Sequence, residues 1–194
     1  MSRETALEKT QQGSFGTEGE QLEWSYYDTA TLAAATLVHR LFTNPLGAAG
    51  KTKADTNLTT AAQMPQGHHL EVNAVKVMYE SSAAKATADV QSFYDLLTET
   101  TATIILGSVK DMGEWTLQEL MGSASLFAMT PTAAGDNIPL IQPRFTGIYP
   151  LNVPIIIAAL TPFEVRIEHH VAVAAGLAND KLKISLCGIL TRLS

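Results

Sequence analysis

A regular alternation of apolar and charged residues near the C-terminus constrains the fold of this chain more than any other feature. In segment 163–168, apolar residues alternate with Glu, Arg and Glu. Successive side chains of a β-strand point to opposite faces of the sheet, so this pattern predicts a strand that turns Phe163, Val165 and Ile167 inward. Segment 181–190 has the same period and is predicted to place four residues on its inner face: Leu182, Ile184, Leu186 and Leu190.

Other segments predict further strands and one helix. Strands are expected in three apolar segments, 69–79, 101–109 and 153–160. Segment 87–98 repeats apolar residues at helical spacing and predicts a short helix, whereas segment 114–120 fits either a short helix or a strand.

The second half of segment 69–79 is apolar on both faces. Strict alternation puts four residues on one face, with Lys76 interrupting them: Leu70, Val72, Ala74 and Met78. The other face then carries Val75, Val77 and Tyr79.

Segment 24–41 mixes helix-favouring Ala with strand-favouring Thr, Tyr and Val, and strand is expected in part of it. Asp28 is a candidate cap for a short helix there. The aromatic cluster of Trp24, Tyr26 and Tyr27 suits either an interface anchor or packing on the outside of the fold.

Long loops rich in Gly and Pro separate these segments, at 43–67 and at 130–144. A loop as long as 43–67 is usually functional or held by a partner. No regular alternation of strands and long helices is present, which argues against a parallel α/β fold. The predicted fold class is all-β with one or two short helices, as a single jelly-roll sandwich or barrel over 23–194. Residues 1–22 are polar, contain three spaced glycines, and are predicted to form a flexible arm.

Low charge favours a surface that is buried against other subunits, the alternative being a domain that is simply rich in small residues such as Ala and Thr. The chain has 46% hydrophobic and only 16% charged residues, where globular domains carry roughly 25% charged residues. The formal net charge is −6 and no basic run is present, so no nucleic-acid motif is predicted.

The single cysteine, Cys187, is interpreted as a packed thiol.

Targeting and membrane segments are not expected. The N-terminal region stays polar past residue 20, and the longest apolar run, 153–160, is far shorter than the roughly 18 residues of a membrane span. We therefore expect synthesis in a cytosol.

Catalytic and nucleotide-binding motifs fail on their spacing. Gly47 and Gly50 precede Lys51 and Thr52, but a phosphate-binding loop has four residues between its glycines and leads into a helix. No serine lies in a nucleophile elbow, and Glu164 is predicted to face solvent together with the other charges of its strand. No enzyme activity, catalytic residue or cofactor is therefore predicted.

The histidines leave one alternative open. Cupin-type metal sites place two histidines two residues apart on a strand, so that both face inward, whereas here each pair is adjacent, at 68–69 and 169–170. His69 and Glu71 share a strand face, and His169 is the residue that could complete a His/His/carboxylate set for iron. Otherwise no metal site is predicted.

Three segments carry a family resemblance. They are Phe42-Thr-Asn-Pro-Leu-Gly leading into Lys51–Leu58, the strand Leu70–Val77, and Pro162-Phe-Glu-Val-Arg-Ile-Glu. Together they resemble coat proteins of tailless icosahedral bacterial viruses, whose shells are built from jelly rolls. With 194 residues the chain matches the single-barrel members and not the double-barrel ones.

The resemblance implies a structural virion protein, a capsid subunit that assembles with copies of itself and with other virion proteins into an icosahedral shell. Its location would be the virion, after synthesis in the host cytoplasm. The alternatives are a cupin-like metal-dependent enzyme and a carbohydrate-binding jelly roll, because the same barrel supports all three functions.

Overall fold

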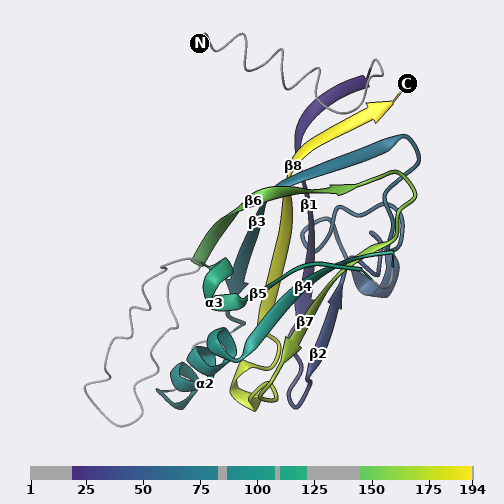
Figure 1. Ribbon diagram of the computed structural model, residues 1–194. Helices are drawn as coiled ribbons and strands as arrows, with labels where there is room; N and C mark the ends of the chain where they lie inside the picture. The colour runs from purple at the N-terminus through teal and green to yellow at the C-terminus, as the bar shows by residue number, and fades with distance from the viewer. Residues whose placement is uncertain (1–18, 83–86, 108–109, 122–144, 194) are drawn as a thin grey trace.

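In the part of the chain that the structure describes, eight antiparallel strands form two four-stranded sheets that face each other across one apolar core (Figure 1). The computed structural model describes residues 19–82, 87–107, 110–121 and 145–193. The elements, in chain order, are β1 (Gly19–Thr31), β2 (Val38–Leu41), η1 (Ala48–Gly50), β3 (His68–Glu80), α2 (Thr87–Thr98), β4 (Thr100–Leu106), β5 (Lys110–Thr116), α3 (Leu117–Leu120), β6 (Phe145–Ile157), β7 (Phe163–His169), η2 (Ala175–Leu177) and β8 (Lys181–Leu193). The predicted all-β class with short helices is confirmed.

The two sheets are built from interleaved strands. The first sheet has the order β1-β8-β3-β6 and the second has the order β2-β7-β4-β5. All neighbouring strands run antiparallel, and only β4 and β5 are consecutive strands within one sheet. Every other connection crosses from one sheet to the other, so the core is enclosed by residues distant in the sequence.

The inner faces predicted for the last two strands are confirmed. Phe163, Val165 and Ile167 of β7 are at most 2% exposed, and the four predicted inner residues of β8 are at most 1% exposed. Full burial of such side chains stabilises the fold by roughly 1.5–3 kcal/mol each. These two strands lie inside their sheets, β8 between β1 and β3 and β7 between β2 and β4.

The faces predicted for β3 are wrong beyond Val72, because a β-bulge intervenes. Val72 pairs with Gly188 of β8, but the next pair is Ala74 with Cys187, so Asn73 is an extra residue. A bulge of this kind reverses the face of every later side chain. The core-facing residues of β3 are therefore five: Leu70, Val72, Val75, Val77 and Tyr79.

Gly188 is required by this bulge. A Cβ atom at position 188 would lie 1.8 Å from the carbonyl oxygen of Glu71 on the neighbouring strand. Gly188→Ala is therefore expected to lower the free energy of unfolding by about 1–3 kcal/mol, as measured by urea denaturation. Cys187→Ala is the control, because it removes a half-buried thiol without adding atoms. A Gly188→Ala protein as stable as the wild type would contradict the close approach.

The remaining predictions differ mainly at element ends. The helix at 87–98 and the strand in segment 101–109 are confirmed, and segment 114–120 contains both a strand end and α3. Segment 153–160 contains only the end of a strand that begins at Phe145.

Segment 24–41 holds most of β1 and all of β2, with a loop between them. Residues 19–22, which we assigned to the flexible arm, instead begin β1 and pair with β8. Residues 1–18 and the whole of the predicted turn-rich segment 130–144 lie outside the described residues.

The described helices are too short to cross a membrane.

Candidate functional site

The residues of the proposed metal set lie in different sheets. His69 and Glu71 belong to β3 in the first sheet, whereas His169 is the last residue of β7 in the second sheet and is 3% exposed. Within the described ranges, no three His, Cys, Asp or Glu side chains come together as metal ligands would. The geometry therefore gives the metal-site alternative no support.

The glycine-rich segment that superficially resembles a phosphate-binding loop forms a tight turn. Gly47 and Gly50 have positive φ angles of 86° and 73°, and a single 3₁₀ turn lies between Gly47 and Lys51. Without a following α-helix there are no N-terminal amides to hold a phosphate.

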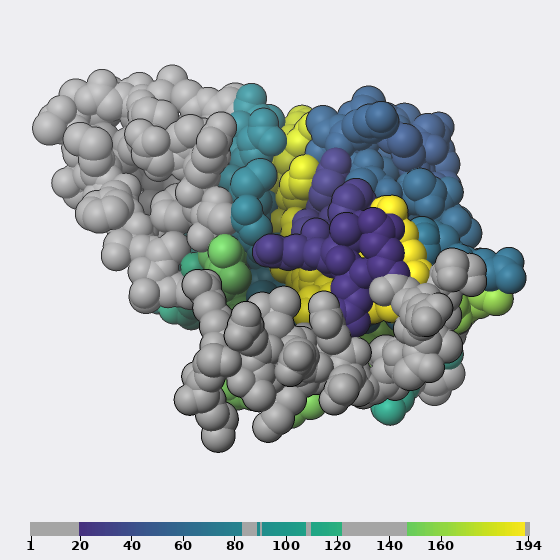
Figure 2. All heavy atoms as spheres, turned by 90° about the horizontal axis from the view of Figure 1, so that it is seen from above, coloured from purple at the N-terminus to yellow at the C-terminus, as the bar shows by residue number. Residues whose placement is uncertain are grey.

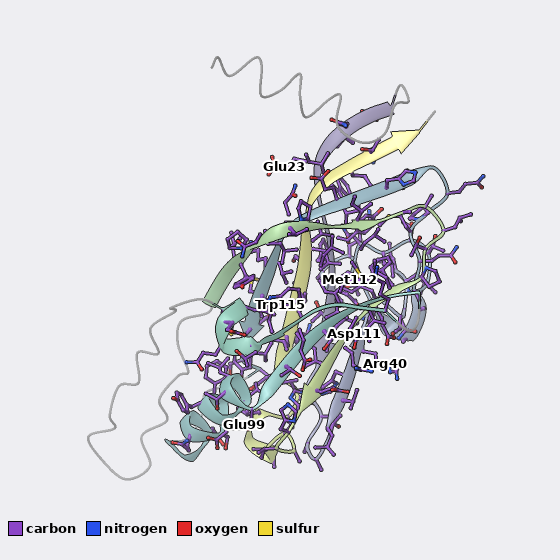
Figure 3. The ribbon with its side chains drawn as sticks, in the orientation of Figure 1. Glu23, Arg40, Glu99, Asp111, Met112 and Trp115 are labelled. Carbon is purple, nitrogen blue, oxygen red and sulfur yellow. The ribbon has the colours of Figure 1, made fainter. Side chains whose placement is uncertain are left out.

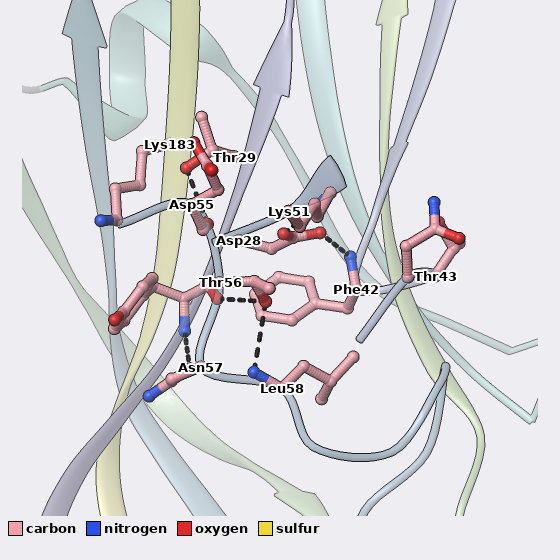
Figure 4. A network of polar contacts seen from close by, with 12 residues as sticks. Asp28, Thr29, Phe42, Thr43, Lys51, Asp55, Thr56, Asn57, Leu58 and Lys183 are labelled. Carbon is pink, nitrogen blue, oxygen red and sulfur yellow. Dashed lines mark hydrogen bonds and ion pairs between the residues drawn. The ribbon is translucent and has the colours of Figure 1, made fainter. Parts of the chain in front are cut away.

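Lys51 instead makes an ion pair with the fully buried Asp28. Its Nζ lies 2.5 Å from Asp28 Oδ1, and the other carboxylate oxygen accepts a 2.5 Å hydrogen bond from the Phe42 backbone N–H (Figure 4). Asp28 lies within β1, three residues before its end, so the prediction that it caps a short helix is wrong. Its carboxylate therefore joins β1 to Phe42, directly before the long loop, and to Lys51 within that loop.

The long loop 43–67 also attaches to the outer edge of β1 through Asn57. The Asn57 side-chain oxygen accepts from Tyr27 N–H at 2.9 Å, and its amide group donates to the Ser25 carbonyl at 2.8 Å. The Asn57 N–H donates to the Tyr27 carbonyl at 3.3 Å, which also accepts from the Thr56 hydroxyl at 3.1 Å. Asn57 thus satisfies the backbone of β1 as a neighbouring strand would.

Further polar contacts fix the loop across the first sheet. Asp55 pairs with Lys181 of β8 at 3.2 Å, and Lys183 donates to the Ala54 carbonyl at 2.8 Å while lying 4.0 Å from the Tyr27 ring centroid. Hydrogen bonds from the Thr52 backbone and hydroxyl lower the pKa of Asp55 to about 2. The predicted loop is therefore present, and it is held by the chain's own strands.

A groove opens beside the part of β1 that the loop leaves uncovered. It has a volume of about 1060 Å³ and lies against residues 21–25 of β1, extending over Ala74 and Cys187 on the neighbouring strands. This part of β1 projects beyond the sandwich together with the end of β8 (Figure 1). In the view from above, the purple start of the described chain lies at the surface of the molecule (Figure 2). Figure 3 labels Glu23 on the projecting segment.

The aromatic cluster divides between the core and this groove. Tyr26 is 4% exposed and Trp24 is 38% exposed, with the rings in edge-to-face contact at 6.4 Å. Arg192 of β8 lies 5.9 Å from the Trp24 ring centroid. Burial raises the pKa of the Tyr26 hydroxyl and of the Cys187 thiol at the floor of the groove. A thiol held protonated fits our interpretation of Cys187 as a packed side chain.

Large apolar side chains are also exposed elsewhere on the surface. One group surrounds the start of β2 and the end of β7: Leu37, Val38 and Val171. The backbone there is joined by the hydrogen bond from His169 N–H to the Leu37 carbonyl at 2.7 Å, which places these residues at one end of the sandwich. A second group lies along and after β6: Ile148, Val153, Ile156 and Leu160.

Two histidines from different strands meet inside the second sheet. The rings of His39 and His169 are 5.2 Å apart, and His169 Nδ1 shares a 2.8 Å hydrogen bond with the Thr100 hydroxyl. Among the described atoms, the Nε2 of each ring is buried without a hydrogen-bond partner. Burial lowers the pKa of both, that of His169 to about 4, so the neutral forms are favoured.

A scan of protein-family models found no match to this chain, and a search of curated protein sequences found none either. The functional assignment therefore depends on the geometry of this chain.

Proposed function

We propose that this chain is a structural virion protein, a capsid subunit that assembles with copies of itself into an icosahedral shell. It would be made in the host cytoplasm and reside in the virion. The first support is the strand order. Two facing four-stranded antiparallel sheets, ordered β1-β8-β3-β6 and β2-β7-β4-β5, support the proposal of a jelly roll, the fold of many viral shell proteins.

The observation that carries the proposal is the exposure of large apolar side chains on both the ends and the edges of the sandwich. Val153 is 76% exposed, Ile148 62% and Val171 57%. Several large apolar side chains exposed on one edge strand, such as Ile148, Val153 and Ile156 of β6, are typical of surfaces that contact other proteins. The low charge content of the chain has the same explanation.

The alternative functions have less support in the described residues. A cupin-like enzyme would need its metal ligands together, and His69 and His169 lie in different sheets. A carbohydrate-binding surface would need an aromatic platform. Among the described residues, the exposed aromatic side chains are Trp24 on β1 and Tyr94 on α2, one on each of two separate elements.

The test is the assembly state of the purified chain. Light scattering coupled to size exclusion and electron micrographs are expected to show closed particles or defined oligomers whose interfaces bury well over about 1,000 Å². Val153→Asp is expected to reduce assembly while circular dichroism stays unchanged, because the side chain is exposed and outside the core. Gln66→Glu, which adds the same charge at an exposed polar position, is the matched control. A monodisperse monomer at high concentration would overturn the proposal.

A further inference from the structure

Among the four edges of the described sheets, β1 is the one whose projecting half has no proline, bulge or break in register within the described residues. Exposed edges are normally blocked by prolines, bulges or short length, because their free backbone groups pair with other chains. β6 carries Pro150 and Pro154, β2 has four residues, and β5 has an irregular register against β4. Residues 19–25 of β1 contain no proline and keep an unbroken register with β8.

The free backbone groups of this edge follow from the contacts of Asn57. Because Asn57 bonds to Tyr27 and Ser25 from the side away from β8, the odd-numbered residues of β1 direct their N–H and C=O groups outward. Gln21 and Glu23 therefore direct unpaired backbone groups outward at the edge of the first sheet, since among the described strands only β8 pairs with β1.

We infer that this edge pairs with the same edge of a second copy, antiparallel and with a two-fold axis at Leu22. This rests on the proposed self-assembly and names one of its contacts. Among the described residues the open edge runs from Gly19 to Ser25, where Asn57 closes it, and Leu22 is the midpoint of this range. With a two-fold axis at Leu22, residues 19–25 of one copy lie opposite residues 25–19 of the other, so the whole open edge is paired.

The side chains and the backbone agree with this register. Gln21 faces Glu23 of the second copy, both with outward backbone groups, so they form a hydrogen-bonded pair in which an amide meets a carboxylate. The two Leu22 side chains form the close, non-hydrogen-bonded pair at the axis. An axis shifted by half a residue, between Gln21 and Leu22, would place Glu20 opposite Glu23, which is a repulsive pair.

The partly exposed Trp24 gains cover from the same pairing. Its ring lies opposite Glu20 of the second copy. In each copy Arg192 lies near Trp24, 5.9 Å from the ring centroid, and its guanidinium is 3.7 Å from the Glu20 carboxylate. The pairing therefore brings the Glu20 carboxylate of each copy close to Arg192 of the other copy. It also joins the first sheets of the two copies into one eight-stranded sheet.

Disulfide trapping tests the register. The background is Cys187→Ser, which removes the chain's single cysteine. Leu22→Cys is expected to give covalent dimers on mild oxidation, because Cα atoms of a close pair are about 4.5 Å apart, within disulfide reach. Glu20→Cys is the matched control on the same strand. Its two copies would be about 14 Å apart and should not link.

A charge exchange tests the same pairing without cysteine. Gln21→Glu places two repulsive pairs in the interface and is expected to weaken dimerisation roughly tenfold, whereas Gln21→Lys faces Glu23 and should not weaken it. Sedimentation measures both. Particles that form without a Leu22 cross-link would overturn the β1 pairing and leave the capsid proposal standing. A chain that stays monomeric would overturn both, and equal cross-linking at Glu20 and Leu22 would overturn the register.

Discussion

Replacing Asp28 with alanine is expected to lower the free energy of unfolding by about 3–5 kcal/mol, because it leaves the partly buried Lys51 ammonium without its counter-ion. Lys51 has a side chain only 15% exposed, and its ammonium is 2.5 Å from the Asp28 carboxylate. The same substitution leaves the Phe42 N–H without its acceptor. Urea denaturation followed by fluorescence measures the loss, and hydrogen exchange at the Phe42 amide is expected to speed up.

Three further variants separate the contributions at this site. Asp28→Asn keeps an oxygen for the Phe42 N–H and should lose less stability than Asp28→Ala. The double variant Asp28→Ala/Lys51→Met removes both charges and is expected to recover part of the loss. Glu164→Ala is the surface control: it breaks the exposed pair with Arg40 and should cost at most about 1 kcal/mol. If Asp28→Ala costs no more than Glu164→Ala, the buried pair does not anchor the loop.

The periodicity of apolar residues correctly predicted those strands and the helix whose side-chain directions are not changed by a bulge in their own backbone. β7 and β8 alternate without interruption, and both lie between two other strands, so their inner residues could be identified by counting. Segment 87–98 has the helical spacing and forms α2. In these segments each residue's own preference agrees with its place in the fold.

The errors arise where pairing with a distant strand overrides the local pattern. An extra residue at Asn73 changes the faces of β3, and nothing in segment 69–79 marks it, since both faces are apolar there. The first half of β6 contains Gly147 and Pro150, which disfavour strands, yet it pairs with β3 from Phe145 onward. Such pairings depend on residues more than sixty positions away and are not encoded locally.

The candidate interaction site could not be predicted from the sequence, because it too is formed by residues that are distant along the chain. Asp28 and Lys51 are 23 positions apart, and the groove brings residues near 23, 74 and 188 together through the strand order of the first sheet. One residue did indicate the site from the sequence: Trp24 lies between Glu23 and Ser25, and a large aromatic residue among polar neighbours suits an interface anchor. Its position beside an open edge makes it part of the inferred contact.

Acidification from pH 6.5 to pH 4 is expected to remove about 3 kcal/mol of stability through His169 alone. Its pKa is lowered from 6.5 to about 4 in the folded chain, first by burial and then by the nearby His39. The unfolded chain therefore binds the proton more readily in this window, and stability falls by about 1.4 kcal/mol per pH unit until the folded form is also protonated near pH 4. Above pH 6.5 this contribution is constant.

Variants of the histidines isolate this effect from the titration of other groups. His169→Gln keeps a polar partner for the Thr100 hydroxyl but cannot titrate, so its stability should decline less between pH 6.5 and 4. His170→Gln changes the adjacent, exposed imidazole and is expected to retain the wild-type slope. Parallel profiles for wild type and His169→Gln would show that the buried pair does not control the acid response. With the expected result, protonation charges a site at the junction of β2 and β7. The short edge strand β2, held by four residue pairs, is then the element expected to detach first.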